Sequence, residues 1–263
     1  MRILVCMKQI LDPDVPARDF RIDDDRKEAE RGGANLVPNI FCENALETAL
    51  QLRDANGGSV TAVSFGTEEA EDVLRKALAM TADEAALVTR PDGPAPDALT
   101  VARVLAAAAR KLGDFDVVMV GRESGDWGVG QTGGLVAEEL GLPMVALVDH
   151  AEAEDGGLSL RRQTDYGFDT VQAQCPVLVT VTNCEGNVPR IPKTRDVMKS
   201  YRKPLTTWSM EELAVTPDEG FAEVVELSIP SQDISCEFVE GDSLDQKVDA
   251  FARKIANVMS GLG

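Results

Sequence analysis

Short apolar runs alternate with longer amphipathic segments along the chain as far as Asp149. The apolar runs are continuous, which is typical of strands that are covered on both faces of a sheet. The longer segments space their apolar residues as a helix does. This β/α alternation predicts a doubly wound, mostly parallel sheet of flavodoxin-like or Rossmann-like topology. The predicted strands are 3–7, 60–65, 85–89, 116–120 and 144–148, and the predicted helices are 42–57, 67–83, 96–113 and 131–141.

The pattern changes after Asp149. Three strand-like runs follow, at 158–167, 169–174 and 176–182, and they predict a hairpin or meander that completes the sheet. Residues 187–204 predict a loop and one short helix, and 205–240 lack a clear periodicity before an amphipathic helix at 244–262. We therefore expect an α/β domain at 1–186 and a protruding segment at 187–204. An extended C-terminal arm at 205–263 would need another surface to cover it.

The net charge of the chain excludes some classes of binding partner. The chain has 26 basic and 45 acidic residues, a formal net charge of −19, which argues against nucleic acid and anionic membranes as main partners. The longest apolar stretch, around Arg103, is too short to span a bilayer. Residues 1–7 do not resemble a signal or transit peptide, so we expect a cytoplasmic protein without membrane insertion. The five cysteines have no C-x-x-C spacing and are expected to be reduced and buried.

The segment GRESGDWGVGQTGG, residues 121–134, holds six glycines between a predicted strand and a predicted helix. Glycine is costly there unless the loop needs unusual dihedral angles or a close approach to a ligand. Ligands of open parallel sheets bind at the carboxyl ends of the strands, where this loop lies. The first N–H groups of the helix, at Gln131 and Thr132, suit a phosphate, and the Asp126 carboxylate suits a ribose hydroxyl. The spacing matches neither a Walker A motif nor G-x-G-x-x-G, so a loop without a ligand is the alternative.

Two further segments are expected on the same edge, because they follow the first two predicted strands. The backbone at Cys6–Lys8 and at Phe65–Gly66 could contact an adenine edge, and Asn39 stands at the start of the next helix. No catalytic set accompanies them: His150 is the only histidine, and no nucleophile or metal motif surrounds it. The sequence therefore predicts an adenine nucleotide that is held and not turned over.

Basic residues concentrate in 187–204, although the chain as a whole is acidic. Asp196 is the only acid in this segment, and Val197, Met198 and Tyr201 form an apolar strip beside the charges. A charged rim around an apolar centre is typical of a transient protein contact. An ordinary solvated helix is the alternative. The basic residues are Arg190, Lys193, Arg195, Lys199, Arg202 and Lys203.

Together these segments resemble the small (beta) subunit of electron transfer flavoproteins over about the first 205 residues. The resemblance is carried by ILVCMKQILDPD at the amino terminus, NIFCENALETALQLRD at 39–54, AVSFGTEEAEDVLRKALAMTADEAALV at 62–88, the glycine-rich loop at 121–134 and VTVTNCEGNVPRIPKTRDVMKS at 179–200.

The resemblance implies an electron carrier, not an enzyme, that pairs with a larger alpha subunit carrying the redox-active FAD. It also implies a nucleotide in this subunit, AMP or, in bifurcating members, a second FAD. A flavin-containing dehydrogenase would dock on 187–204, and the arm after about Pro204 would pack on the large subunit. The implied nucleotide residues are Cys6, Met7, Lys8, Asn39, Phe65, Gly66, Asp126, Gly130, Gln131, Thr132 and Gly133; the implied docking residues are Arg190, Lys193, Thr194, Arg195, Met198 and Lys199.

The chain departs from the family at two places. AMP-binding members typically have Asn where Gly130 stands, and bifurcating members have Val where Thr132 stands, so the loop favours AMP. Members that dock acyl-CoA dehydrogenases have a Leu-Pro pair in line with Thr194 and Arg195. A missing leucine anchor costs about 1–3 kcal/mol, which predicts a different dehydrogenase. A stand-alone ATP-using enzyme is the rival from another class, but it would need a glycine-rich loop after the first strand, and Lys8–Asp14 has none.

Overall fold

The computed structural model describes residues 1–16, 18–91, 93–216, 222–229 and 236–261. These belong to two compact units, Met1–Leu227 and Ser228–Gly263. Parts of the predicted C-terminal arm, 217–221, 230–235 and 262–263, lie outside the described residues. No helix in the described part of the chain combines the length and the apolar character needed to cross a bilayer.

The first unit is built on a nine-stranded sheet with the strand order β11-β10-β9-β12-β8-β1-β6-β7-β13. All neighbouring pairs from β9 to β13 are parallel, and only β10 and β11 run antiparallel to their neighbours. The predicted doubly wound, mostly parallel sheet is therefore confirmed. The strands are β1 (Arg2–Met7), β6 (Ser59–Gly66), β7 (Glu84–Thr89), β8 (Val117–Gly121), β9 (Met144–Glu154), β10 (Gly157–Thr164), β11 (Gly167–Gln174), β12 (Val177–Val181) and β13 (Thr206–Ser209).

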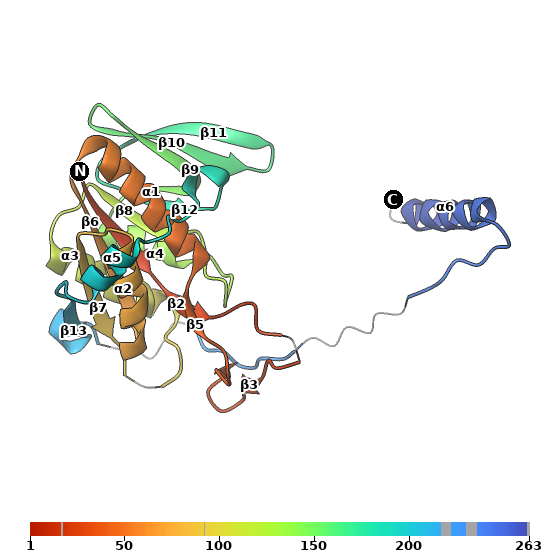
Figure 1. The fold of residues 1–263 in the computed structure, drawn as a ribbon, viewed down its shortest axis with the longest axis horizontal. Helices are drawn as coiled ribbons and strands as arrows, with labels where there is room; N and C mark the ends of the chain where they lie inside the picture. Colours follow the sequence, from red (N-terminus) through yellow and green to blue (C-terminus); the bar gives the residue numbers. More distant parts are fainter. Residues whose placement is uncertain (17, 92, 217–221, 230–235, 262–263) are drawn as a thin grey trace. The chain divides into compact units, whose positions relative to one another are not determined.

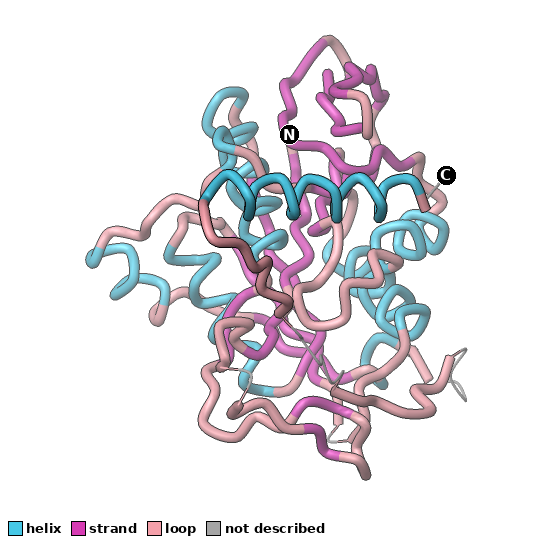
Figure 2. Tube along the Cα trace, turned by 90° about the vertical axis from the view of Figure 1, so that its right-hand side faces the viewer, coloured by secondary structure: helices cyan, strands magenta, loops and turns pink. Residues whose placement is uncertain are grey.

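Helices cover both faces of this sheet (Figures 1 and 2). Ile3, Val5 and Met7 of β1 pack into one core with α1 (Ile40–Asn56) and α2 (Glu71–Ala79). Leu4 and Cys6, which point the opposite way, pack into a second core with α3 (Ala98–Leu112) and α4 (Thr132–Leu140). Because successive strand side chains alternate between faces, a strand buried on both sides needs the unbroken apolar run seen in the sequence.

The winding direction reverses at β1. The chain runs from β1 through β6 to β7 on one side of the sheet and then crosses back through α3 to β8 on the other side of β1. Right-handed crossovers then place α1 and α2 on one face and α3 and α4 on the other. The carboxyl ends of β1 and β8 therefore form the topological switch point, where ligands of open α/β sheets bind.

Two strands lie where the sequence pattern did not place them. The run 176–182 was expected to complete a meander, but β12 returns between β8 and β9 and is parallel to both. All five of its residues are buried, which is the signature of an interior strand. Residues 206–209, within the stretch that lacked periodicity, form β13 and pair with β7 at the sheet edge. An edge strand of four residues, two exposed and two partly buried, leaves too short a pattern to detect.

Smaller elements complete the first unit and form the second. Two short antiparallel pairs, β2 (Gln9–Leu11) with β5 (Leu36–Pro38) and β3 (Ile22–Asp23) with β4 (Glu28–Ala29), follow β1. The short helix α5 (Thr194–Ser200) packs on α2. In the second unit, the amphipathic helix predicted near the carboxyl terminus is α6 (Leu244–Ser260).

The cysteines differ in environment, and the expectation that all are buried is wrong for three of them: Cys236 is exposed, and Cys175 and Cys184 are only partly buried. Cys6 and Cys42 are buried. Burial raises the pKa of the Cys6 thiol to about 12, with a smaller contribution from Cys42. The pKa of the Cys42 thiol is also raised, chiefly by burial, although a hydrogen bond from Asn39 opposes the shift.

We expect iodoacetamide at about pH 8 to alkylate Cys236 of the isolated chain and to leave Cys6 and Cys42 unmodified, because the thiolate is the reactive species. Peptide mass spectrometry after timed quenching measures this order. Denaturant should make all five cysteines reactive, which serves as the control. Labelling of Cys6 at the same rate as Cys236 in the folded chain would contradict the buried position of β1.

Candidate functional site

The segments that follow β1 and β8 meet at the switch point, and Asn39 holds them together. This residue, which is 1% exposed, precedes α1. Its side-chain Nδ2 donates to the carbonyl oxygen of Glu123 (2.8 Å), and its Oδ1 accepts from the backbone N–H of Gly125 (3.1 Å). Its backbone N–H donates to the carbonyl oxygen of Lys8 (2.8 Å). One buried amide thus fixes the glycine-rich loop against both α1 and the end of β1.

A second link between the two segments is ionic. The Nζ of Lys8 lies 2.7 and 2.8 Å from the two carboxylate oxygens of Asp126 and donates to the hydroxyl of Ser124 (3.2 Å). The Asp126 carboxylate also accepts from the backbone N–H of Trp127 (2.9 Å). Both charged side chains remain partly exposed at the rim, at 41% for Lys8 and 29% for Asp126. The carboxylate is therefore oriented and still accessible from solvent.

Glycine is required at several points of the loop. Gly128 and Gly130 have φ of 62° and 67°, in the left-handed region that side chains disfavour. Gly121 lies so close to α1 that a Cβ there would be 2.8 Å from the backbone of Phe41 and Cys42. The glycines thus allow a left-handed loop and a close contact between the end of β8 and the start of α1.

The start of α4 has an open N-terminus. Gln131 is the N-cap residue, and its side chain makes no capping hydrogen bond to the helix. Gly133 in the first turn lies against β12, where a Cβ would be 2.4 Å from Cγ2 of Thr180. An uncapped first turn leaves backbone N–H groups and the positive end of the helix dipole for an anion.

The structure brings all eleven sequence-predicted nucleotide residues to this edge. Cys6 and Met7 have side chains in the two cores, so that only their backbone could reach a ligand. Phe65 and Gly66 end β6, which is the neighbour of β1. Ser124, which holds the Lys8 ammonium, was not predicted, and a serine inside a glycine-rich loop gives no signal of its own. Nucleotide contacts at these positions stay a prediction.

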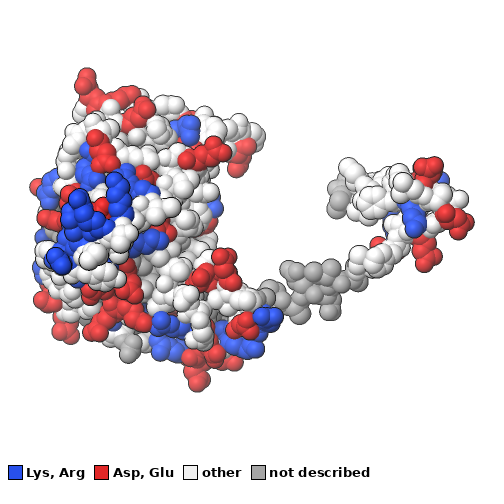
Figure 3. Space-filling model, in the orientation of Figure 1, with Lys and Arg blue, Asp and Glu red and all other residues white. Residues whose placement is uncertain are grey.

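Most of the predicted docking residues lie on an exposed surface. Lys and Arg side chains gather on the face over α5 (Figure 3). Met198 and Tyr201 are 62% and 67% exposed among them. Arg190 differs from this group, because its guanidinium forms ion pairs with Glu47 and Asp54 of α1. The other predicted docking residues, Lys193, Thr194, Arg195 and Lys199, are exposed.

The fold is that of a doubly wound, mostly parallel α/β protein. Comparison with known proteins identifies its family. The electron transfer flavoprotein domain matches residues 29–213, and the chain belongs to this family. The expected family and its electron-transport role are thereby confirmed.

Individual relatives align with most of the chain. The chain is 35% identical to the electron transfer flavoprotein subunit beta of Clostridium acetobutylicum, over 82% of this chain and 81% of that protein. It is 33% identical to the Caffeyl-CoA reductase-Etf complex subunit CarD of Acetobacterium woodii, over 83% and 82%. It is 29% identical to the beta subunit of Bacillus subtilis, over 94% of both chains.

Two adjacent glycines of α4 give a matched test of this site. Gly133→Ala would force a methyl group against Thr180 and should destabilise the isolated chain by about 1–3 kcal/mol. Gly134→Ala places a Cβ whose nearest contact, Cε of Met144, is 4.0 Å away, and should stabilise the helix by up to about 1 kcal/mol. Urea unfolding followed by circular dichroism measures both. Equal effects of the two substitutions would contradict the packing of α4 on β12.

Proposed function

We propose that the chain is the small subunit of a heterodimeric electron transfer flavoprotein that holds one AMP at the switch point and shuttles electrons from a dehydrogenase to an acceptor. The single observation that carries the nucleotide assignment is the uncapped start of α4, preceded by a glycine-rich loop that Asn39 holds in place. Because Asn39 and Lys8 hold the loop through contacts within the chain, little conformational entropy would be lost on binding.

The residues at this edge fit an adenylate. The N–H groups around Gln131, Thr132 and Gly133 would bind the phosphate. The Asp126 carboxylate, oriented by Lys8, would accept hydrogen bonds from the ribose. The backbone at Cys6–Lys8 and Phe65–Gly66, together with Gly130, would surround the rest of the nucleotide, and the buried Asn39 would hold the loop in place.

The FAD of the partner would supply the redox chemistry when bound. This chain would hold the nucleotide, orient the large subunit and present residues 187–204, which we call the docking segment, to a flavin-containing dehydrogenase. The α/β domain at 1–186 would carry the nucleotide. The exposed, partly apolar and basic surface over α5 supports the docking role.

Of the predicted arm at 205–263, β13 belongs to the sheet of the first unit, and the part that contains α6 would pack on the large subunit. An apolar stripe along α6 supports this part of the proposal, because its side chains are 45% to 76% exposed within the second unit. Exposed apolar stripes of this length commonly mark a protein contact. The stripe consists of Leu244, Val248, Phe251, Ile255 and Val258.

A second FAD in place of AMP, as the resemblance to bifurcating members implies, is the competing assignment. Thr132 favours AMP, because the bifurcating pattern has Val there. Co-expression with the large-subunit gene, followed by release of the nucleotides in denaturant and chromatography, separates the two. We expect one FAD and one AMP per heterodimer. Two FAD would replace the AMP assignment with the bifurcating one, and a heterodimer without any nucleotide in this subunit would overturn the proposal.

The docking role predicts a charge effect on partner affinity. The assay uses the dehydrogenase from the same genome that reduces the heterodimer fastest, with the heterodimer as its substrate. Lys199→Gln should raise the KM of that dehydrogenase for the heterodimer by about 2- to 5-fold, because charges at the rim of a contact steer association. The kcat should stay unchanged, and the dependence of KM on salt should become weaker. Arg110→Gln, an exposed cation of α3 on the other face of the sheet, is the matched control. A KM that Lys199→Gln leaves unchanged would count against docking at this segment.

A further inference from the structure

The first residues of the docking segment cover a polar stripe on α1. Asn44, Glu47 and Thr48 are at most 5% exposed although they are polar. Asn187, which is 1% exposed, forms hydrogen bonds with Asn44 and Thr48. It accepts from Nδ2 of Asn44 through its carbonyl oxygen (3.0 Å) and donates from its own Nδ2 to the carbonyl oxygen of Thr182 (2.8 Å). The docking segment is therefore held on α1 from the point where it follows β12.

Arg190 adds a bidentate ion pair with Glu47 to this contact between the docking segment and α1. Its Nε and Nη2 donate to the two carboxylate oxygens of Glu47, at 2.8 and 3.0 Å, and its backbone N–H donates to the same carboxylate (3.1 Å). Gln51 also donates to Glu47 (3.1 Å) and to the carbonyl oxygen of Gly186 (2.8 Å). The side chain of Glu47 is 6% exposed. The hydrogen bonds from Arg190 to Glu47 raise the pKa of the Arg190 guanidinium above its usual value.

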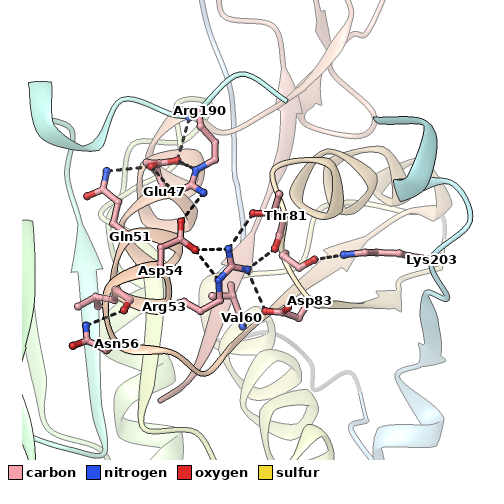
Figure 4. Close-up of polar contacts among 12 residues, drawn as sticks. Glu47, Gln51, Arg53, Asp54, Asn56, Val60, Thr81, Asp83, Arg190 and Lys203 are labelled. Carbon is pink, nitrogen blue, oxygen red and sulfur yellow. Dashed lines mark hydrogen bonds and ion pairs between the residues drawn. The ribbon is translucent and has the colours of Figure 1, made fainter. Parts of the chain in front are cut away.

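The same guanidinium connects to a wider network (Figure 4). Nη1 of Arg190 donates to Asp54 (2.9 Å), which also accepts from Arg53 (2.7 Å). Arg53 reaches Asp83 (3.3 Å), and Asp83 accepts from the backbone N–H of Val60 in β6 (2.8 Å). The anchor of the docking segment is thus tied to α1 and to the central sheet.

The far end of the segment is held by α2. Nη1 of Arg75 donates to the carbonyl oxygens of Ser200 (2.8 Å) and Lys203 (2.7 Å), and Nζ of Lys203 donates to the carbonyl oxygen of Ala82 (2.7 Å). The side chain of Arg75 is only 15% exposed. Both ends are therefore fixed on buried or half-buried partners, while the middle presents exposed side chains.

We propose that Arg190, held by Glu47, is a positioning residue that keeps the docking segment in the conformation a redox partner binds, and that it does not itself contact that partner. This inference rests on the docking role of the segment proposed above. Binding to a segment that is already ordered avoids the entropy cost of ordering it at each encounter.

The direction in which one substitution changes the affinity for the redox partner separates this positioning role from simple charge steering. Glu47→Gln makes a basic docking surface more positive. Steering alone would then leave the partner's binding unchanged or make it tighter. Loss of positioning would weaken it instead, because Arg190 loses its charged partner and the segment gains freedom.

The experiment uses the heterodimer and the dehydrogenase that reduces the wild-type heterodimer fastest. We expect Glu47→Gln and Arg190→Gln each to raise KM about 2- to 10-fold with kcat and the salt dependence unchanged. The double variant should show no more than the larger single effect, because the two residues act as one unit. Amide hydrogen exchange at 191–203 should rise in these variants and not at 121–131. FAD and AMP content verifies that each variant is folded.

Arg195→Gln is the matched control. This side chain is 79% exposed, so its loss should raise KM, weaken the salt dependence and leave hydrogen exchange unchanged. Asp54→Asn removes only the more exposed partner of Arg190 and should act in the same direction as Glu47→Gln but less, which keeps the test usable if a Glu47 variant does not fold.

Three outcomes would overturn the inference. In the first, Arg190→Gln raises the KM and Glu47→Gln leaves it unchanged, which would indicate that Arg190 contacts the partner directly. Another is unchanged exchange at 191–203 in both variants, and the third is raised exchange with an unchanged KM. If no dehydrogenase reduces even the wild-type heterodimer, the proposed docking function itself fails and the inference falls with it.

Discussion

The fold depends on one constraint: β1 is paired on both sides and buried on both faces. Its backbone pairs in parallel with β6 and β8, and its side chains divide between two cores. A strand in that position makes the chain wind outward in both directions, so that the carboxyl ends of β1 and β8 form the switch point of the sheet. The contacts of Lys8 and Asn39 with the glycine-rich loop follow from that geometry, because both residues come directly after strands or loops that end at this edge.

Helix α1 links the two functional regions of the first unit. Its first residues lie against the glycine-rich loop, through Asn39 and the close approach of Gly121. Its middle and last turns hold the docking segment through Glu47 and Asp54. In both regions the side chains of and beside α1 mainly hold other segments in place. A single helix thus sets the position of the glycine-rich loop and of the docking segment.

The second unit follows a different principle. α6 has a side-chain cap at its start, where Ser243 accepts from the N–H of Gln246 (3.3 Å), so its helical form is specified locally. Its apolar stripe, in contrast, is exposed among the described residues of its own unit. A helix with such a stripe derives most of its stability from packing of its apolar face.

The sequence by itself determined the strands and helices of the doubly wound sheet, the glycine-rich edge and the family, because apolar periodicity and glycine spacing are local. It did not reveal that β12 lies between β8 and β9, or that residues 206–209 add an edge strand. Nor did it distinguish Arg190 from its exposed basic neighbours. The polar stripe of α1 has the spacing of a solvated face, and only tertiary structure showed that it is covered. Glu47 and Arg190 are 143 positions apart, and pairing of charges at that separation is decided by the path of the chain, which no local pattern records.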